Sequence, residues 1–166
     1  MWLLPLVFLL VACGYKPTSV YTKNVLGEDI YVKVETSLED PENSVLIRDA
    51  INEAVVYKFN AKIANKNEAS AKLYIKLEHV DFQPIEYDKN GYVIAYKTNV
   101  TLLTRYHDKS KNTKDIRTYG DFDFNIASNS IISDTKRFNA IKEASQKAID
   151  AFISRISVEG VNHDHQ

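Results

Sequence analysis

The sequence contains a single cysteine, Cys13, so no disulfide within the chain can stabilise the fold. Internal repeats and low-complexity tracts are also absent, and proline and glycine number only 4 and 5 in 166 residues. The formal net charge is −1, from 21 basic and 22 acidic residues, which excludes a general electrostatic attraction to nucleic acid. Stability must therefore come from a packed core, and any anion binding must be local.

Catalytic signatures are missing as well. The sequence has no Gly-rich phosphate loop, no Gly-x-Ser-x-Gly elbow and no His-Glu-x-x-His motif. The four histidines are expected to be structural or solvated, although a His79–Asp81 dyad and metal binding by the C-terminal histidines are conceivable. They are His79, His107, His163 and His165. We therefore expect no enzyme activity, no cofactor and no metal site.

One long apolar run is present, from Trp2 to Val11. It falls short of the roughly 20 residues that a membrane-spanning helix needs. The run ends in Leu-Val-Ala before Cys13, which resembles the bacterial lipobox, where the signal is cut before a cysteine that then receives lipid. We expect residues 1–12 to be a lipoprotein signal peptide and Cys13 to be the lipidation site. An ordinary secretory signal or a hydrophobic strand is the alternative, and the lack of a preceding Lys or Arg leaves open an upstream start codon.

The sequence after Cys13 has no periodic pattern up to residue 28 and becomes regular from Asp29 onward. Residues 13–28 mix Pro, Thr, Ser, Asn and Gly without periodicity, which predicts a lipidated N-terminal arm in an extended conformation. Apolar and polar residues then alternate from Asp29 to Thr36, the pattern of a half-buried strand. Asp40 and Pro41 are typical of a helix start, and the helix is expected to run to about Asn60. Its apolar face would contain Leu46, Ile47, Ala50, Ile51, Ala54, Val55 and Tyr57.

Three longer strands are predicted at 72–86, 92–107 and 113–126. The apolar parity slips near His79, which predicts a β-bulge, and a bulge between His79 and Asp81 would place these two side chains on different faces of the strand. Asn90-Gly91 is typical of a tight hairpin turn. A closing helix is expected from Asp134 to just before Gly160, followed by a disordered tail at 161–166. Its buried stripe would consist of Phe138, Ile141, Ser145, Ala148, Ile149, Phe152 and Ile156.

These elements predict an α+β fold, a two-layer sandwich in the order β-α-β-β-β-α. Two helices would pack on a four-stranded mixed sheet within a single domain, residues 29–160. The first helix connects its flanking strands as a crossover, so those strands should be parallel, whereas the hairpins make the other pairs antiparallel.

A local excess of positive charge surrounds the second predicted turn, at 108–112. Five basic residues fall within 13 positions, namely Arg105, Lys109, Lys111, Lys114 and Arg117. They could simply solubilise a turn and protect a sheet edge. Alternatively, they could capture an anion, and a phosphorylated, acylated glycolipid would present such charge beside its alkyl chains.

Taken together, several features resemble the LptE family of lipopolysaccharide-assembly lipoproteins, from Cys13 to about Ser157. These are Cys13-Gly14-Tyr15-Lys16-Pro17 after the lipobox, the order of elements, the long strand at 92–107, and Arg137-Phe138-Asn139-Ala140-Ile141 in the closing helix. The resemblance implies no catalysis, and a periplasmic address argues against nucleic-acid binding.

The resemblance implies a lipid-anchored protein of the outer membrane that faces the periplasm and the barrel lumen. There it would act as plug and assembly factor for the barrel protein LptD and would bind lipopolysaccharide. Gly14, rather than Asp, after the cysteine favours outer-membrane sorting by the same resemblance. A lipoprotein that activates a cell-wall synthase, and a lipid-anchored hydrolase, are the alternatives.

Overall fold

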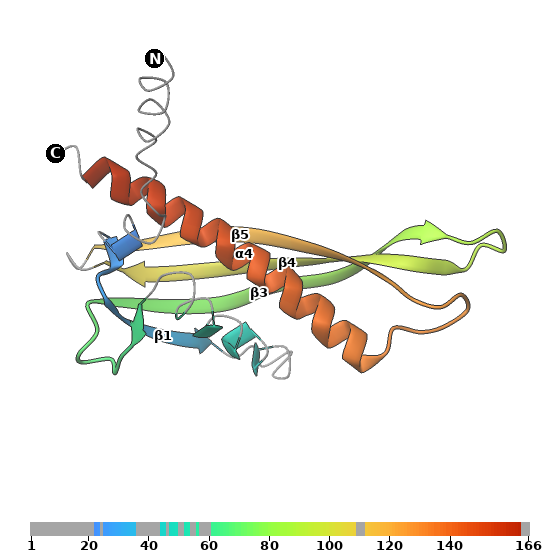
Figure 1. Cartoon of the computed structure of the whole chain (residues 1–166), viewed down its shortest axis with the longest axis horizontal. Coiled ribbons are helices and arrows are strands. Elements are labelled where there is room, and N and C mark those ends of the chain that lie inside the picture. The colour runs from blue at the N-terminus through green and yellow to red at the C-terminus, as the bar shows by residue number, and fades with distance from the viewer. Residues whose placement is uncertain are drawn as a thin grey trace, which may run out of the picture.

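The computed structural model describes residues 22–23, 25–35, 44–45, 47–49, 52–53, 56, 61–108 and 112–163. Five strands and a long helix are assigned within these ranges (Figure 1). They are β1 (Asp29–Glu35), β2 (Lys62–Ile63), β3 (Ala71–Tyr87), β4 (Val93–His107), β5 (Thr113–Asn125) and α4 (Asp134–His163). The described residues between β1 and β2 are helical at 44–45, 47–49, 52–53 and 56.

The strands form one mixed sheet in the order β2-β1-β3-β4-β5. β1 runs parallel to β2 and β3, whereas β3 with β4 and β4 with β5 are antiparallel. The α+β sandwich and the parallel pairing across the helical crossover are thereby confirmed. The sheet has five strands rather than the expected four. β2 was missed because it contains only two residues, both exposed, and so has no alternating pattern.

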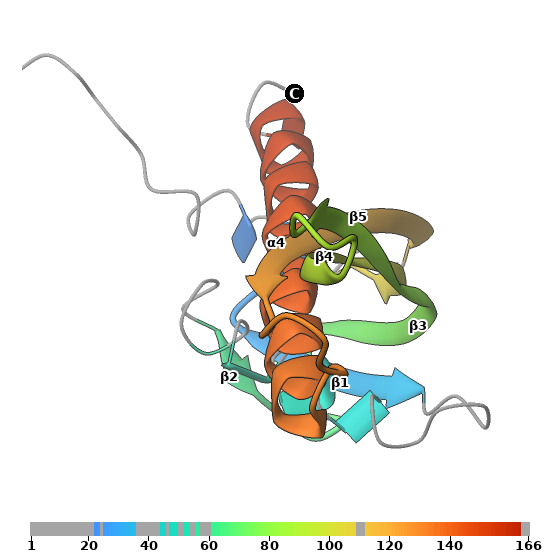
Figure 2. The ribbon, with the colours of Figure 1, turned by 90° about the vertical axis from the view of Figure 1, so that its right-hand side faces the viewer.

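The core lies between the sheet and the helices, on the face that α4 crosses (Figures 1 and 2). Alternate residues of the strands point into it, among them Ile30 from β1, Leu73 from β3 and Leu102 from β4. In the first predicted helix, Ile47 is fully buried as expected, and the other six residues of its apolar face lie outside the described residues.

α4 packs unusually close to β5. A Cβ atom built on Gly120 would lie 2.0 Å from the Ala144 carbonyl oxygen and 2.5 Å from the Ala148 backbone nitrogen. The helix presents Ala140, Ala144 and Ala148, one residue per turn and all fully buried. The backbones of helix and strand therefore approach each other through a row of the smallest side chains.

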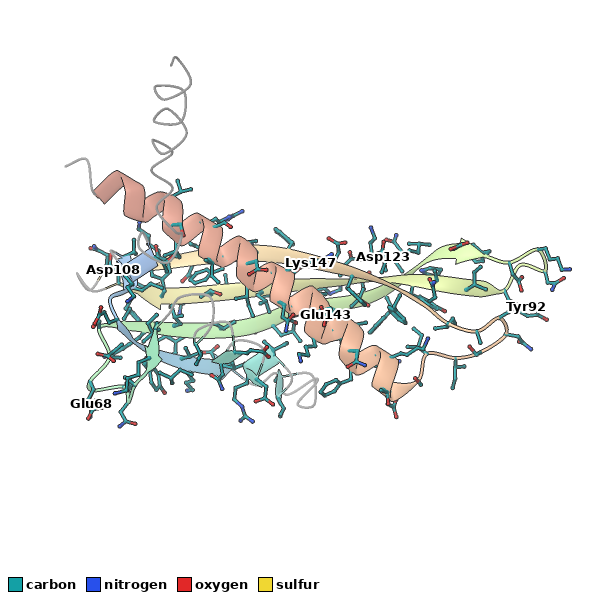
Figure 3. All side chains as sticks on the ribbon, viewed as in Figure 1. Glu68, Tyr92, Asp108, Asp123, Glu143 and Lys147 are labelled. Carbon is teal, nitrogen blue, oxygen red and sulfur yellow. The ribbon has the colours of Figure 1, made fainter. Side chains whose placement is uncertain are left out.

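The β3–β4 hairpin has the predicted bulge and turn. The pairing register shifts between Leu77 and His79, which confirms the β-bulge. Gly91 adopts a positive φ of 85°, and the Asp88 carboxylate accepts hydrogen bonds from the backbone N–H groups of Asn90 and Tyr92 at 2.8 and 2.9 Å. Figure 3 places Tyr92 and Asp108 at opposite ends of this long hairpin.

The N-terminal boundary of the domain differs from the expectation. Thr22, Lys23, Val25 and Leu26 are helical, so the extended arm does not reach residue 28. Val25 and Leu26 belong to the core, and the Thr22 hydroxyl lies 3.0 Å from that of Ser157 in α4. Burial of these two apolar side chains draws the segment into the domain before Asp29.

The closing helix, α4, also differs from the prediction, in its C-terminal extent and in the exposure of its first residues. It continues through Gly160 to His163, so residues 161–163 of the expected tail are helical; residues 164–166 lie outside the described ranges. An interior glycine costs a helix only about 1 kcal/mol, which did not end this one. Phe138 was expected on the buried stripe but is 43% exposed. It belongs to the first part of the helix, residues 134–139, which is exposed throughout. The other six residues of the expected stripe are buried.

Candidate functional site

The sheet face opposite α4, called the polar face below, carries ordered rows of side chains. One row, formed by directly paired residues, crosses four strands as Lys33, Tyr74, Arg105 and Asp115. Directly paired side chains on one face lie about 5 Å apart at their Cβ atoms, so neighbours in such a row can interact. Arg105 thus stands between an aromatic ring on β3 and a carboxylate on β5.

An aromatic row lies beside these residues. The ring of Tyr74 contacts Tyr31 edge to face at 6.2 Å and His107 at 5.7 Å, between ring centroids. Two hollows adjoin this row, of about 460 and about 480 Å³, and both are lined by Tyr74 and His107. We call them together the Tyr74 groove. The remaining lining residues are Glu35, Lys66, Ala69, Ser70, Lys72, Lys76, Leu103, Arg105 and Asp108.

The lining of the Tyr74 groove is rich in cations. It includes Lys66, Lys72, Lys76 and Arg105, against the carboxylates of Glu35 and Asp108. The Asp108 carboxylate is buried and accepts hydrogen bonds from the backbone N–H and the side-chain amide of Asn112, at 2.9 and 3.1 Å. This carboxylate holds the β4–β5 turn. Among the lining residues, cationic side chains outnumber carboxylates by four to two.

Arg105 forms a bidentate ion pair with Asp115. Its Nε and Nη2 atoms donate to the two carboxylate oxygens at 2.8 and 2.9 Å. These hydrogen bonds hold the pKa of Asp115 below its usual value and raise the pKa of the guanidinium. The two side chains are 57% and 43% exposed, so the pair forms in contact with solvent.

Arg117 makes a similar pair with Glu78, the residue that the bulge adds to β3. Its Nε and Nη2 atoms lie 2.5 and 3.0 Å from the Glu78 carboxylate, and the hydrogen bonding lowers the pKa of that carboxyl group. The fold therefore supplies a carboxylate partner to each arginine of the predicted basic cluster.

The predicted basic cluster does not form one surface. Arg105 and Arg117 lie on the polar face, whereas Lys114 pairs with the buried Tyr106 and so belongs to the opposite face of the sheet. Lys109 and Lys111 lie outside the described residues. Sequence reasoning missed Tyr74 and its flanking lysines, although the alternation of Lys72, Tyr74 and Lys76 with apolar residues marked them as one polar strand face.

The His79–Asp81 pair corrects one step of the sequence argument. A bulge was expected to place these two side chains on different faces. The bulge instead falls at Glu78, before both residues, so they share a face, and His79 Nε2 lies 3.3 Å from an Asp81 carboxylate oxygen. The two side chains are 65% and 41% exposed, so the contact lies at the protein surface.

Within the described ranges, no cluster of three or more His, Cys, Asp or Glu side chains has a geometry that could hold a metal ion. No helix in the part of the chain that the structure describes is long and apolar enough to span a membrane.

The structure is thus a two-layer α+β domain, and the sheet face that α4 does not cross carries a groove lined by cationic and aromatic side chains. Comparison with protein families identifies the family of this domain. Residues 28–156 match the family model LptE, described as lipopolysaccharide-assembly. The chain therefore belongs to the LptE family, and the resemblance inferred from the sequence is confirmed.

Solved structures share the fold. Rare lipoprotein B from Shewanella oneidensis superposes with a TM-score of 0.54 at 16% identity, covering 83% of this chain and 100% of that one. A putative lipoprotein from Caulobacter crescentus gives 0.53 at 10% identity, covering 87% and 96%. A protein from Xanthomonas campestris gives 0.55 at 9% identity, covering 84% and 88%. Comparison with curated protein sequences gives no match.

Proposed function

We propose that this protein is a lipid-anchored lipoprotein of the outer membrane that assists the transport of lipopolysaccharide and its insertion there. It acts as plug and assembly partner of the barrel protein LptD and performs no catalysis. The observation that carries the proposal is the family match over residues 28–156. The lipobox before Cys13 supports a lipid anchor, and the family match favours this role over activation of a cell-wall synthase or a hydrolase.

Purification of the tagged, lipidated protein from outer membranes tests the proposed partner. We expect a large β-barrel protein to co-purify in near-equal amount and to survive washing in high salt, because a plug buries an extensive surface. Recovery of a peptidoglycan synthase in place of the barrel would contradict the proposal. An unrelated tagged domain behind the same lipobox sequence is the control for recovery that depends only on the lipid anchor and on detergent extraction.

Cys13→Ala is expected to abolish lipid attachment and to move the protein from the membrane to the soluble fraction. A stable anchor requires more than one acyl chain, because each buried CH₂ contributes only about 0.8 kcal/mol. Labelling with radioactive palmitate, together with fractionation, checks this result. The circular dichroism spectrum should stay unchanged, since the core begins at Val25 among the described residues. Undiminished labelling would mean that Cys13 is not the acceptor.

The basic residues around the β4–β5 turn are proposed to contact lipopolysaccharide phosphates. Replacing Lys109, Lys111 and Lys114 with Glu should weaken lipopolysaccharide binding, and more strongly at low salt, because exposed charges are screened over about 8 Å at physiological ionic strength. A titration at two salt concentrations measures the effect. The control replaces Lys89, Lys142 and Lys147 with Glu, which changes the net charge equally away from the turn. Equal weakening in both variants would assign the effect to net charge alone.

A further inference from the structure

We propose that the Tyr74 groove binds the phosphorylated sugar headgroup of a glycolipid, and that the phosphate takes the place of the Asp115 carboxylate on Arg105. This inference rests on the proposed function and adds to it a location, a set of contacts and a competing group. The observation behind it is that Arg105 lines the groove while its guanidinium is held by Asp115.

The shape and lining of the groove fit a sugar that carries phosphate. Its hollows, of about 460 and about 480 Å³, fall within the range of small-molecule sites. The rings of Tyr74 and His107 provide an amphipathic wall against which the apolar C–H face of a sugar can pack. Lys72 and Lys76 flank Tyr74 on the same face of β3, so cations stand on both sides of the ring.

Arg105 lies where its guanidinium can bind either the Asp115 carboxylate or a phosphate in the groove. It pairs directly with Tyr74 on β3 and with Asp115 on β5, so its guanidinium lies between the groove and the carboxylate. The planar guanidinium binds carboxylate and phosphate through the same two parallel hydrogen bonds. Asp115 therefore occupies the position on Arg105 that a phosphate would take.

The exchange from carboxylate to phosphate is favourable because the existing pair is exposed. Solvent-exposed ion pairs contribute little, whereas a phosphate monoester brings more negative charge and meets Lys76 on the same rim. Asp115 then lies beside the bound phosphate as a like charge. It thus opposes binding twice, first by holding Arg105 and afterwards by repelling the ligand.

Asp115→Asn tests this role in the full-length, lipidated protein. Binding is measured to phosphatidylcholine vesicles that contain lipopolysaccharide, with plain phosphatidylcholine vesicles as the baseline. We expect affinity to rise about three- to fivefold, the factor that corresponds to an exposed ion pair. Asp123→Asn is the matched control, because Asp123 lies on the same face of β5 and pairs with Lys97 at 3.7 Å, but lines neither hollow of the groove. Equal gains in both variants would overturn the proposal.

Tyr74→Ala provides an independent test with the opposite sign. Loss of the ring should weaken vesicle binding, whereas Tyr119→Ala should leave it unchanged, because Tyr119 lies on the same polar face outside the groove. Circular dichroism verifies that both variants fold. Should Tyr74→Ala unfold the domain, Asp115→Asn still decides the question, since that change removes no packed side chain.

Free glucosamine 1-phosphate identifies the source of the headgroup. The glycolipid assignment predicts that this sugar phosphate competes with the vesicles only at far higher phosphate concentration, because it lacks the acyl chains. Equally tight binding of the free sugar phosphate would overturn that assignment. The barrel co-purification is scored separately in each variant. If the barrel is recovered but Asp115→Asn does not change vesicle binding, glycolipid binding in the Tyr74 groove is refuted, whereas the proposed function still holds.

Discussion

Replacing Gly120 with Val is expected to lower the free energy of unfolding by about 3 kcal/mol or more, the upper end of what overpacking costs. A side chain at this position would meet backbone atoms of α4, since even the Cβ would lie 2.0 Å from the Ala144 carbonyl oxygen. Backbone cannot rotate aside as a flexible side chain can. The helix must therefore lift from β5 and loosen its row of buried alanines, Ala140, Ala144 and Ala148.

Urea unfolding of the purified protein measures this loss. Tyr119→Val is the matched control, because Tyr119 precedes Gly120 on β5, is 61% exposed and receives the same β-branched residue. We expect the control to change the midpoint little and Gly120→Ala to fall between the two. If Gly120→Val and Tyr119→Val unfold at the same urea concentration, α4 does not rest on the β5 backbone.

Much of this architecture was predictable because its strands are amphipathic. Apolar and polar residues alternate along β4 and β5, and only one register keeps Leu102 and Ile116 in the core with Arg105 and Arg117 outside. The slip of parity near His79 likewise had a single economical explanation, which the register shift after Leu77 confirms. Elements with a regular alternation of buried and exposed residues could therefore be predicted from the periodicity of the sequence.

Elements without periodicity were not predictable in this way. β2 has two exposed residues, and backbone hydrogen bonds join this segment to β1, from Lys62 to the Glu28 carbonyl and from Ala64 to that of Ile30. The segment at Val25 and Leu26 contains only two apolar residues, too few to define a helix face, yet both are buried. Gly120 looked like an unremarkable strand residue, because its role depends on a helix more than 20 positions later in the chain.

The candidate site shows the same division between local and distant information. Arg105 could be recognised from its charge and position near a turn. Its two neighbours, Tyr74 and Asp115, could not be recognised from the sequence. Tyr74 lies beside Arg105 because of the pairing register of β3 with β4, and Asp115 because of the register of β4 with β5. Clustering of charge along the sequence therefore located one end of the sheet, while the strand pairing determined which residues share a face.

Truncation of Phe152 to Ala is expected to cost about 3–5 kcal/mol, the usual range for a fully buried phenylalanine. Phe152 was placed on the buried stripe of the closing helix from its spacing, and it is 3% exposed in the structure. Its ring packs edge to face on Tyr106 of β4, with centroids 6.0 Å apart, and Tyr106 is itself fully buried. Removal of the ring leaves a cavity between helix and sheet that neither backbone can close.

Lys147→Ala is the control for this prediction. Lys147 lies on the solvent side of the same helix and reaches Asp121 at 3.9 Å, an exposed pair whose loss should be barely measurable. Phe152→Leu should cost less than Phe152→Ala, because leucine fills part of the cavity and keeps the surface apolar. Thermal melts of the three variants rank them directly. Equal melting temperatures for Phe152→Ala and Lys147→Ala would show that α4 does not hold the sheet through this face.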